Sequence, residues 1–346
     1  FAAECACTGN CQHATLWEKV VADFSEAKIG WLLVVVACFL ISVLSRAMRW
    51  NILIEPMGYK VRTFNTFFAT MLGYLINLAL PRAGEIAKPA ALQQYEKVPL
   101  EKLMGTIVVD RIFDVIMLLL VFGLTFLTQF DAIYGFISGE TRPVAPTCIN
   151  APTAPAEVAA TGGFNWWWLL YGALGVSVVA LALVVWKWQQ IRQSALYQRI
   201  YLLAVNFGEG IKTVFRLRRP YMFIVHTLVI WLMYFLMTYF CFWAYEPTAH
   251  LGANAALLAF VFGGLGILVP SPGGMGTYQI VVMAALIVYG IGSADAFAFA
   301  NIIFFTINIF GNMFFGLLAY AVMPLYNRGY VPELPASHYA ANEPKK

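Results

Sequence analysis

The sequence predicts an all-α polytopic membrane protein, and its composition and long apolar runs are the observations behind this prediction. Of the 346 residues, 61% are hydrophobic and only 12% are charged, and the mean hydropathy is +0.72. A soluble domain carries about 25% charged residues, whereas apolar runs of about 20 residues are long enough to cross a bilayer as helices. The alternating pattern of a membrane β-barrel is absent.

The apolar runs give the order of the elements. We expect a polar N-terminal tail over 1–28, a single transmembrane domain over 29–326 and a polar C-terminal tail over 327–346. Within the domain the apolar segments are, in chain order, 29–45, 63–80, 105–130, 164–186, 221–245, 251–294 and 296–326. Depending on which of them cross, the chain has about five to seven spans plus two re-entrant helical hairpins.

Lys and Arg residues between the apolar runs predict the orientation, since cytoplasmic loops carry an excess of positive charge. Segments 46–62, 88–102 and 187–219 are basic and should be cytoplasmic. Segment 131–163 holds one Arg and no Lys, and segment 246–250 holds neither. Both should lie outside. The N-terminal tail is then extracytoplasmic and the C-terminal tail cytoplasmic.

This orientation predicts the first re-entrant hairpin. Both flanks of 63–88 are cytoplasmic, so the segment must enter the membrane, turn at Pro81 to Glu85 and return on the same side. Segment 251–294 is likewise too long for one span and is broken at Pro270 to Gly276. The alternative for this second segment is a pair of ordinary spans joined by a tight turn.

The two breaks are similar in sequence. Residues 80–85 read L-P-R-A-G-E and residues 269–274 read V-P-S-P-G-G, so each has a hydrophobic residue, Pro and Gly at the end of an uncharged helix. Half-repeats of about 29–130 and 220–326, joined by a connecting span at 164–186, would form an inverted repeat. Many transporters have this plan, with broken helices meeting near mid-membrane.

Charged residues interrupt the apolar sequence around the first break. A charge at the bilayer centre costs about 2.5–3.5 kcal/mol on insertion scales, so it usually has a partner and a function. One interpretation is a structural salt-bridge network that locks the hairpin to the next span. The other is that Arg82, with Arg111 or Lys88, binds an anionic head group. The six residues are Arg82, Glu85, Lys88, Asp110, Arg111 and Asp114.

The breaks themselves add candidate substrate-binding residues. Small residues expose backbone N–H groups that can donate to an anion, although they also allow close packing of helices. The candidates of this kind, with one neighbouring tyrosine, are Pro81, Gly84, Pro270, Ser271, Gly273, Gly274 and Tyr278.

For several other residues we expect a structural role. Arg46, Arg49 and Trp50 close the first apolar run, so we expect an interfacial anchor in contact with lipid phosphates. His226 stands alone in an apolar span, where a packing role is expected. No nucleophile–base set or phosphate-binding loop is apparent, and the cysteines of the N-terminal tail fit no standard zinc spacing. We therefore expect no enzyme, cofactor or metal site; the enzymatic alternative is a membrane acyl or phosphoryl transferase using Asp110, Asp114 and Arg82.

Three motifs in order resemble one known family. They are L-P-R-A-G-E-I-A-K at 80–88, V-V-D-R-I-F-D at 108–114 and G-G-L-G-I-L-V-P-S-P-G-G-M-G-T-Y-Q at 263–279, and R-A-M-R-W at 46–50 fits as well. They resemble the lysylphosphatidylglycerol synthase transmembrane (flippase-like) family, over about 31–326. The resemblance implies a bacterial or archaeal cytoplasmic-membrane protein that moves a lipid between leaflets. The candidates that fall on the motifs are Pro81, Arg82, Gly84, Glu85, Arg111, Asp114, Pro270, Gly273 and Gly274.

The departures from the family pattern limit what is implied. Glu is usual where Asp110 stands, the family usually has a further span ahead of the first one here, and no aminoacyl-transfer domain follows Tyr326. We expect a flippase for an anionic, aminoacylated or polyprenyl-phosphate-linked lipid. The partner is then a membrane lipid of phospholipid or polyprenyl-phosphate type, and the net charge of +4 is too small to indicate nucleic acid. The alternative is a non-transporting scaffold or partner subunit whose ion pairs are only structural.

Overall fold

The computed structural model describes most of the predicted transmembrane domain. The described residues are 22, 24–80, 82–130, 217–268, 271 and 274–333. All regular structure within these ranges is helical, which confirms the all-α fold class. The expected connecting span at 164–186, most of both tails, and the turn residues Pro81, Pro270 and Gly273 lie outside the described residues.

The described helices are joined by short connections, except across residues 131–216, which lie outside the described residues. In chain order they are α3 (Ile29–Ile54), α4 (Thr63–Ala79), α5 (Gly84–Glu96), α6 (Leu100–Thr128), α11 (Pro220–Ala244), α12 (Ala253–Leu268), α13 (Thr277–Ile287), α14 (Ser293–Phe305), the π-helical stretch η4 (Thr306–Phe314) and α15 (Phe315–Tyr326). There are also two single turns of 3-10 helix. The turn η1 (Glu55–Met57) follows α3, and the turn η2 (Glu246–Thr248) follows α11.

Several of these helices suit a membrane. Among the described residues, Ile29–Met57, Pro220–Ala244 and Ser293–Tyr326 are long and apolar enough to cross one, and Ala253–Ile267 and Thr277–Ile287 are shorter apolar helices. Large hydrophobic side chains remain exposed along α6 and α11, such as Leu119, Leu127 and Leu228. Such a surface is stable in lipid rather than in water, which agrees with a multi-pass membrane protein.

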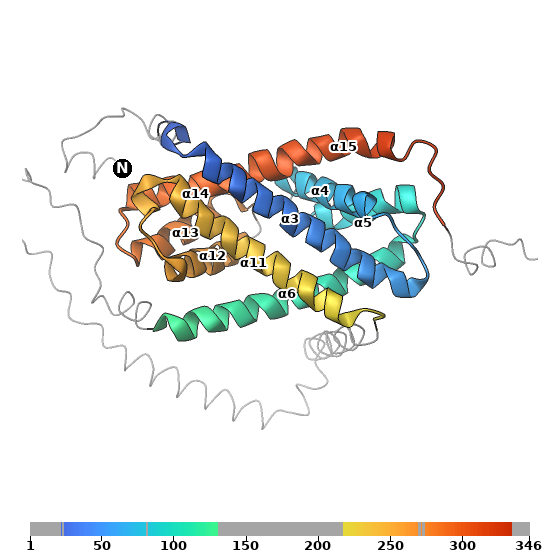
Figure 1. The fold of residues 1–346 in the computed structure, drawn as a ribbon, viewed down its shortest axis with the longest axis horizontal. Helices are drawn as coiled ribbons and strands as arrows, with labels where there is room; N and C mark the ends of the chain where they lie inside the picture. The colour runs from blue at the N-terminus through green and yellow to red at the C-terminus, as the bar shows by residue number, and fades with distance from the viewer. Residues whose placement is uncertain are drawn as a thin grey trace, which may run out of the picture.

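The antiparallel pair of α3 and α11 runs the length of the molecule (Figure 1). The backbone N–H of Lys28 donates to the carbonyl of Ala244 at 2.8 Å, and Ser45 Oγ lies 2.8 Å from Nδ1 of His226. The start of α3 therefore meets the end of α11. His226 has a polar partner on the neighbouring helix, in line with its expected packing role.

The first break produces a helical hairpin. Arg82 adopts a left-handed conformation with φ 66°, and the N–H of Gly84 donates to Asn77 Oδ1 at 2.8 Å. A Cβ on Gly84 would collide with the carbonyl oxygen of Gly73, so only glycine permits this approach. As a result α5 folds back along α4.

The second break produces a similar hairpin from α12 and α13. Thr277 Oγ1 donates to the carbonyl of Gly266 at 2.8 Å, and Gln279 Oε1 accepts from the N–H of Gly276 at 2.7 Å, which caps α13. A Cβ on Gly266 would lie 3.0 Å from Tyr278 Cα. The pair α4–α5 lies toward the C-terminal end of α3, whereas α12 and α13 lie toward the opposite end (Figure 1).

Polar clusters close both ends of the helix assembly. At one end, buried Glu96 accepts from the N–H of Arg62 at 3.0 Å, from Asn65 Nδ2 at 2.6 Å and from the hydroxyl of Tyr330 at 3.0 Å. Burial, together with the hydrogen bond to Glu96, raises the pKa of Tyr330 to about 12. This bond ties the end of the described chain to the open end of the α4–α5 hairpin.

At the other end, Lys28 Nζ donates to Glu246 Oε2 at 2.7 Å, and this exposed hydrogen bond lowers the pKa of Glu246. Gln129 at the end of α6 donates to the carbonyl of Asn254 at 2.9 Å and accepts from the hydroxyl of Tyr289 at 2.6 Å. The second hairpin is thereby fixed to α6.

The apolar core has two parts. One contains residues of α3 up to Val43 together with α12, α13 and α14. The other begins at Trp50 and includes Leu92, Leu103 and Phe223. The turn of α3 between these two parts carries the charged residues described next.

Candidate functional site

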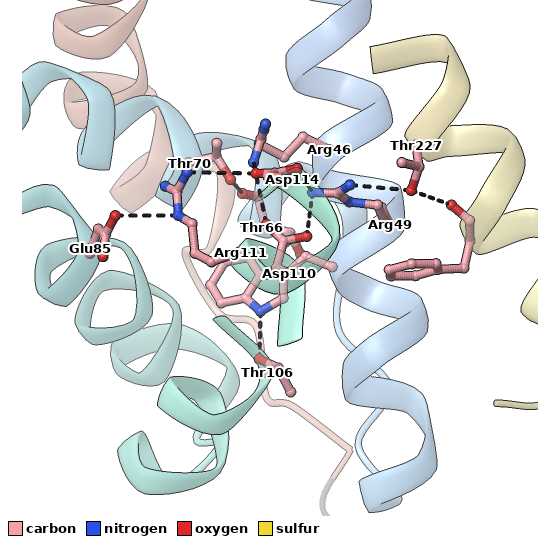
Figure 2. Close-up of polar contacts among 12 residues, drawn as sticks. Arg46, Arg49, Thr66, Thr70, Glu85, Thr106, Asp110, Arg111, Asp114 and Thr227 are labelled. Carbon is pink, nitrogen blue, oxygen red and sulfur yellow. Dashed lines mark hydrogen bonds and ion pairs between the residues drawn. The ribbon is translucent and has the colours of Figure 1, made fainter. Parts of the chain in front are cut away.

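Two arginines of α3 face two aspartates of α6 (Figure 2). Arg46 Nη1 lies 3.3 Å from Asp110 Oδ2 and 2.8 Å from Asp114 Oδ2. Arg49 Nη2 lies 2.7 Å from Oδ1 of each aspartate. The arginines are three residues apart and the aspartates four, so each pair lies on one face of its helix. Each arginine therefore bridges both carboxylates.

The remaining guanidinium edges also have partners. Arg46 Nη2 donates to the hydroxyl of Tyr234 at 3.0 Å, and Arg49 Nη1 donates to Thr227 Oγ1 at 3.2 Å, both on α11. Arg46, Arg49 and Asp110 are only 5%, 0% and 3% exposed. Removing one member of such a buried pair leaves an uncompensated charge and costs about 3–5 kcal/mol. The cluster thus joins α3, α6 and α11.

The interfacial anchor expected at Arg46, Arg49 and Trp50 is wrong. All three side chains are buried. The uncharged run ends at Ser45, but the helix continues to Ile54, so the arginines lie well inside α3. There they bind the carboxylates of α6 in place of lipid phosphates. The missed signal was the three-residue spacing of Arg46 and Arg49, which places both on one helix face, as the four-residue spacing does for Asp110 and Asp114.

A second ion pair links the first hairpin to α6. Arg111 Nε lies 3.3 Å from Glu85 Oε1, and Arg111 Nη1 lies 3.6 Å from Asp114 Oδ2. The side chains of Arg111 and Glu85 are 46% and 43% exposed, so this pair is partly open to its surroundings. It extends the cluster from α6 to the first turn of α5 (Figure 2).

Lys88 contacts an aromatic ring. Its Nζ lies 4.1 Å from the centre of the Trp50 ring, and Trp50 Nε1 donates to Thr106 Oγ1 at 2.8 Å. Lys88 is only 9% exposed. Within the part of the chain that the structure describes, no carboxylate lies within 4.0 Å of this ammonium group.

These side chains surround a small pocket between α3, α4, α5 and α6. Its empty volume, including the part open to the surroundings, is about 340 Å³, but the space left between the side chains is much smaller. That space holds roughly one water molecule. The charged and amide residues that line the pocket are Arg46, Asn77, Glu85, Lys88, Asp110 and Arg111.

A comparison with family models identifies the family of the chain. The model of the family described as the lysylphosphatidylglycerol synthase TM region matches residues 13–314. The chain belongs to this family. No curated protein and no solved structure gives a significant match.

Three of the sequence motifs that resemble this family converge on the pocket. Segment 46–50 supplies Arg46 and Trp50, segment 80–88 supplies Glu85 and Lys88, and segment 108–114 supplies the aspartates. The motifs are separated along the chain but contact one another here. The stretches whose motifs resemble the family therefore build one site.

The structure brings together only part of the predicted set. Gly84, Glu85, Lys88, Asp110 and Arg111 line the pocket, and Asp114 binds its arginines. Arg82 is exposed at the turn and makes no ion pair with any residue of the described ranges.

The residues of the second hairpin lie apart from the ion pairs. Ser271 Oγ is 3.3 Å from Thr277 Oγ1, Gly274 has φ 80°, and Tyr278 packs on Phe304 with ring centres 5.6 Å apart. A Cβ on Gly264 would lie 3.7 Å from Leu118 Cδ1, one helical turn beyond Asp114. The second hairpin therefore touches α6 beside the cluster.

Proposed function

We propose that this family member is a lipid flippase, which moves a membrane lipid between leaflets while the head group passes through the charged pocket. The observation that carries the proposal is a set of buried ion pairs that borders a partly open polar pocket inside an apolar helix assembly. Charged groups buried in a membrane protein usually mark a path for a polar substrate. The carboxylates and guanidinium groups replace the water that a head group loses as it leaves the interface.

The helix lengths support a re-entrant arrangement of both hairpins. With 13 residues, α5 is about 20 Å long, and α13 with 11 residues is about 17 Å long. The hydrocarbon core is about 30 Å thick, so neither helix crosses it alone. We propose that the two hairpins enter from opposite faces as an inverted repeat of a bacterial or archaeal cytoplasmic-membrane protein. The five crossings are then α3, α6, 164–186, α11 and α14 to α15.

Transport in this scheme involves no covalent step. The acyl chains stay in the hydrocarbon while the head group exchanges partners among the lining residues. Glu85 and Arg111 are suited to open this path, because their ion pair is half-exposed and joins the first hairpin to α6.

A leaflet-exchange assay in proteoliposomes tests the proposal. Fluorescent anionic, zwitterionic, aminoacylated and polyprenyl-phosphate lipids should be compared in vesicles with and without protein. We expect exchange of at least one lipid above the protein-free rate, and a lower rate for Glu85→Gln. Glu333→Gln is the control, because Glu333 pairs with Lys60 at 3.5 Å on the exposed surface, away from the pocket. Rates equal to protein-free vesicles across the whole panel would contradict transport.

A non-transporting scaffold is the second candidate function. The observation that favours it is that Arg46 and Arg49 each bridge both aspartates, so the cluster holds α3 to α6 without a ligand. This candidate predicts that Glu85→Gln leaves lipid binding unchanged while the protein stays folded.

A further inference from the structure

The charges of the site do not cancel. It holds four cations, Arg46, Arg49, Lys88 and Arg111, but only three carboxylates. All three carboxylates lie within ion-pair distance of an arginine, at 2.7 to 3.6 Å. The ammonium group of Lys88 is the cation left over.

Lys88 lacks a counter-ion although it is nearly buried. Its Nζ faces the Trp50 ring at 4.1 Å and makes no hydrogen bond or ion pair with any residue in the described ranges. An aromatic face compensates a cation only in part for the loss of water. A buried charge of this kind is stabilised when an anion binds beside it.

The backbone fixes Lys88 at the pocket. A Cβ on Gly73 would lie 3.0 Å from Lys88 Cβ, so α4 and α5 are in close contact at this residue. A second donor in the pocket lining also lacks an acceptor, because Arg46 Nε is buried without a hydrogen-bond partner. The site therefore offers an ammonium group without a counter-ion and an N–H group without an acceptor, while Asp110 Oδ1, which also makes no hydrogen bond, lies 2.7 Å from Arg49 Nη2.

We propose that the pocket binds one monoanionic phosphodiester with the Lys88 ammonium as its counter-ion, so that the transported lipid carries a net charge of about −1 and no amine. This inference rests on the proposed flippase function. A zwitterionic or aminoacylated head group would bring a further positive charge to a site that already has an excess of one. The pocket admits about one water molecule, so the phosphate enters as the Lys88 side chain leaves Trp50.

Binding measurements on the purified chain test this proposal. The probes are short-chain phosphatidylglycerol, phosphatidylcholine and lysyl-phosphatidylglycerol, together with inorganic phosphate, and the readout is the dissociation constant. We expect phosphatidylglycerol to bind about tenfold or more tightly than the other three. Lys88→Met should weaken phosphatidylglycerol binding more than phosphatidylcholine binding and so abolish this preference, whereas Lys88→Arg should retain it.

Lys102 supplies the matched control. Its Nζ lies 5.3 Å from the ring centre of Tyr59, so it makes the same kind of contact, but it is exposed in the first turn of α6 and does not line the pocket. Lys102→Met should leave all four dissociation constants unchanged. An equal loss of the preference in Lys102→Met would overturn the assignment to Lys88.

Other results separate this inference from the proposed function. Leaflet exchange that is equally fast for zwitterionic or aminoacylated lipids would overturn the phosphodiester assignment and leave the flippase in place. Phosphatidylglycerol binding that depends on Lys88, without leaflet exchange of any lipid, would support the site and contradict transport. Inorganic phosphate that binds as tightly as phosphatidylglycerol would overturn the lipid as ligand.

Discussion

Single residues decide how the charged cluster is held. Asp110 and Asp114 are each within ion-pair distance of both α3 arginines, and the guanidinium groups also donate to Tyr234 and Thr227 of α11. Three helices therefore meet at four charged side chains. Loss of any one of the four changes the charge balance of a largely buried region.

Asp114→Asn should destabilise the folded protein by about 3–5 kcal/mol, because both arginines then share a single carboxylate in a buried site. The measurement is thermal unfolding in detergent, followed by fluorescence and by size-exclusion chromatography. Glu333→Gln is the comparison, since its exposed pair with Lys60 contributes about 0–1 kcal/mol. Equal unfolding temperatures for the two variants would show that the buried pairs do not hold α3 to α6.

Arg82 allows backbone strain to be separated from function. It adopts φ 66°, a conformation that costs a non-glycine residue about 1 kcal/mol. Arg82→Gly should therefore keep or raise the unfolding temperature while it lowers leaflet exchange, if the exposed guanidinium contacts the head group.

Lys97 is the control for this prediction, because it has φ 54° at the end of α5 and is exposed outside the pocket. Lys97→Gly should give a similar gain in stability with transport unchanged. Unchanged transport in Arg82→Gly would remove Arg82 from the substrate-binding set.

The sequence allowed the acidic half of the cluster to be predicted, but not its pairing. Asp110 and Asp114 stand one helical turn apart in an apolar run, which indicates a buried shared face. Their partners Arg46 and Arg49 are more than 60 residues away. Since the charges between 82 and 114 already cancel among themselves, nothing in that stretch requires a distant partner.

At the scale of elements, the two breaks form the helical hairpins. The expected apolar segment 63–80 corresponds to α4, which ends at Ala79, and 221–245 corresponds closely to α11. Segment 251–294 was expected to break once, but the structure also ends α13 at Ile287, where Gly290 has φ 80°. The apolar run is continuous there, so hydropathy gave no sign of this turn.

The π-helical stretch was also absent from the expectations. Residues 306–314 depart from the α-helical pattern without proline, and Asn312 Nδ2 donates to Asn308 Oδ1 at 3.0 Å. Gly311 faces the ring of Phe39 on α3. Hydrophobic periodicity does not distinguish a π-helical stretch from an α-helix, so the sequence did not predict this geometry.

Close packing of the first hairpin predicts a specific effect for Gly84→Ala. The added Cβ would collide with the carbonyl of Gly73 and with Asn77, so α5 must move away from α4. We expect a loss of about 1–3 kcal/mol in the free energy of unfolding. Gly105→Ala in α6 is the control: nothing lies within 4 Å of its added Cβ, and alanine favours helix. A Gly84→Ala variant as stable as Gly105→Ala would contradict the close contact of α4 and α5.

On the scale of the whole molecule, basic segments gather at one end. Arg218 lies 3.5 Å from Glu55, and the N–H of Arg62 donates to Glu96, so segments 55–62, 96–97 and 217–219 are neighbours there. Lys28, Glu246 and Gln129 mark the opposite end. This grouping agrees with the orientation predicted from Lys and Arg, although the membrane placement of the hairpins stays a prediction.

Cysteine accessibility tests that placement. Single cysteines at Lys97, Glu246 and Leu80 should be introduced in a cysteine-free background and labelled with an impermeant thiol reagent in right-side-out and inside-out vesicles. We expect Glu246→Cys to react only in right-side-out vesicles and Lys97→Cys only in inside-out ones. Leu80→Cys should react slowly in both, because the tip of the α4–α5 hairpin then lies near mid-membrane, where thiolates do not form readily. If α4 and α5 instead cross the bilayer, Leu80→Cys will react as fast as Glu246→Cys from the outside.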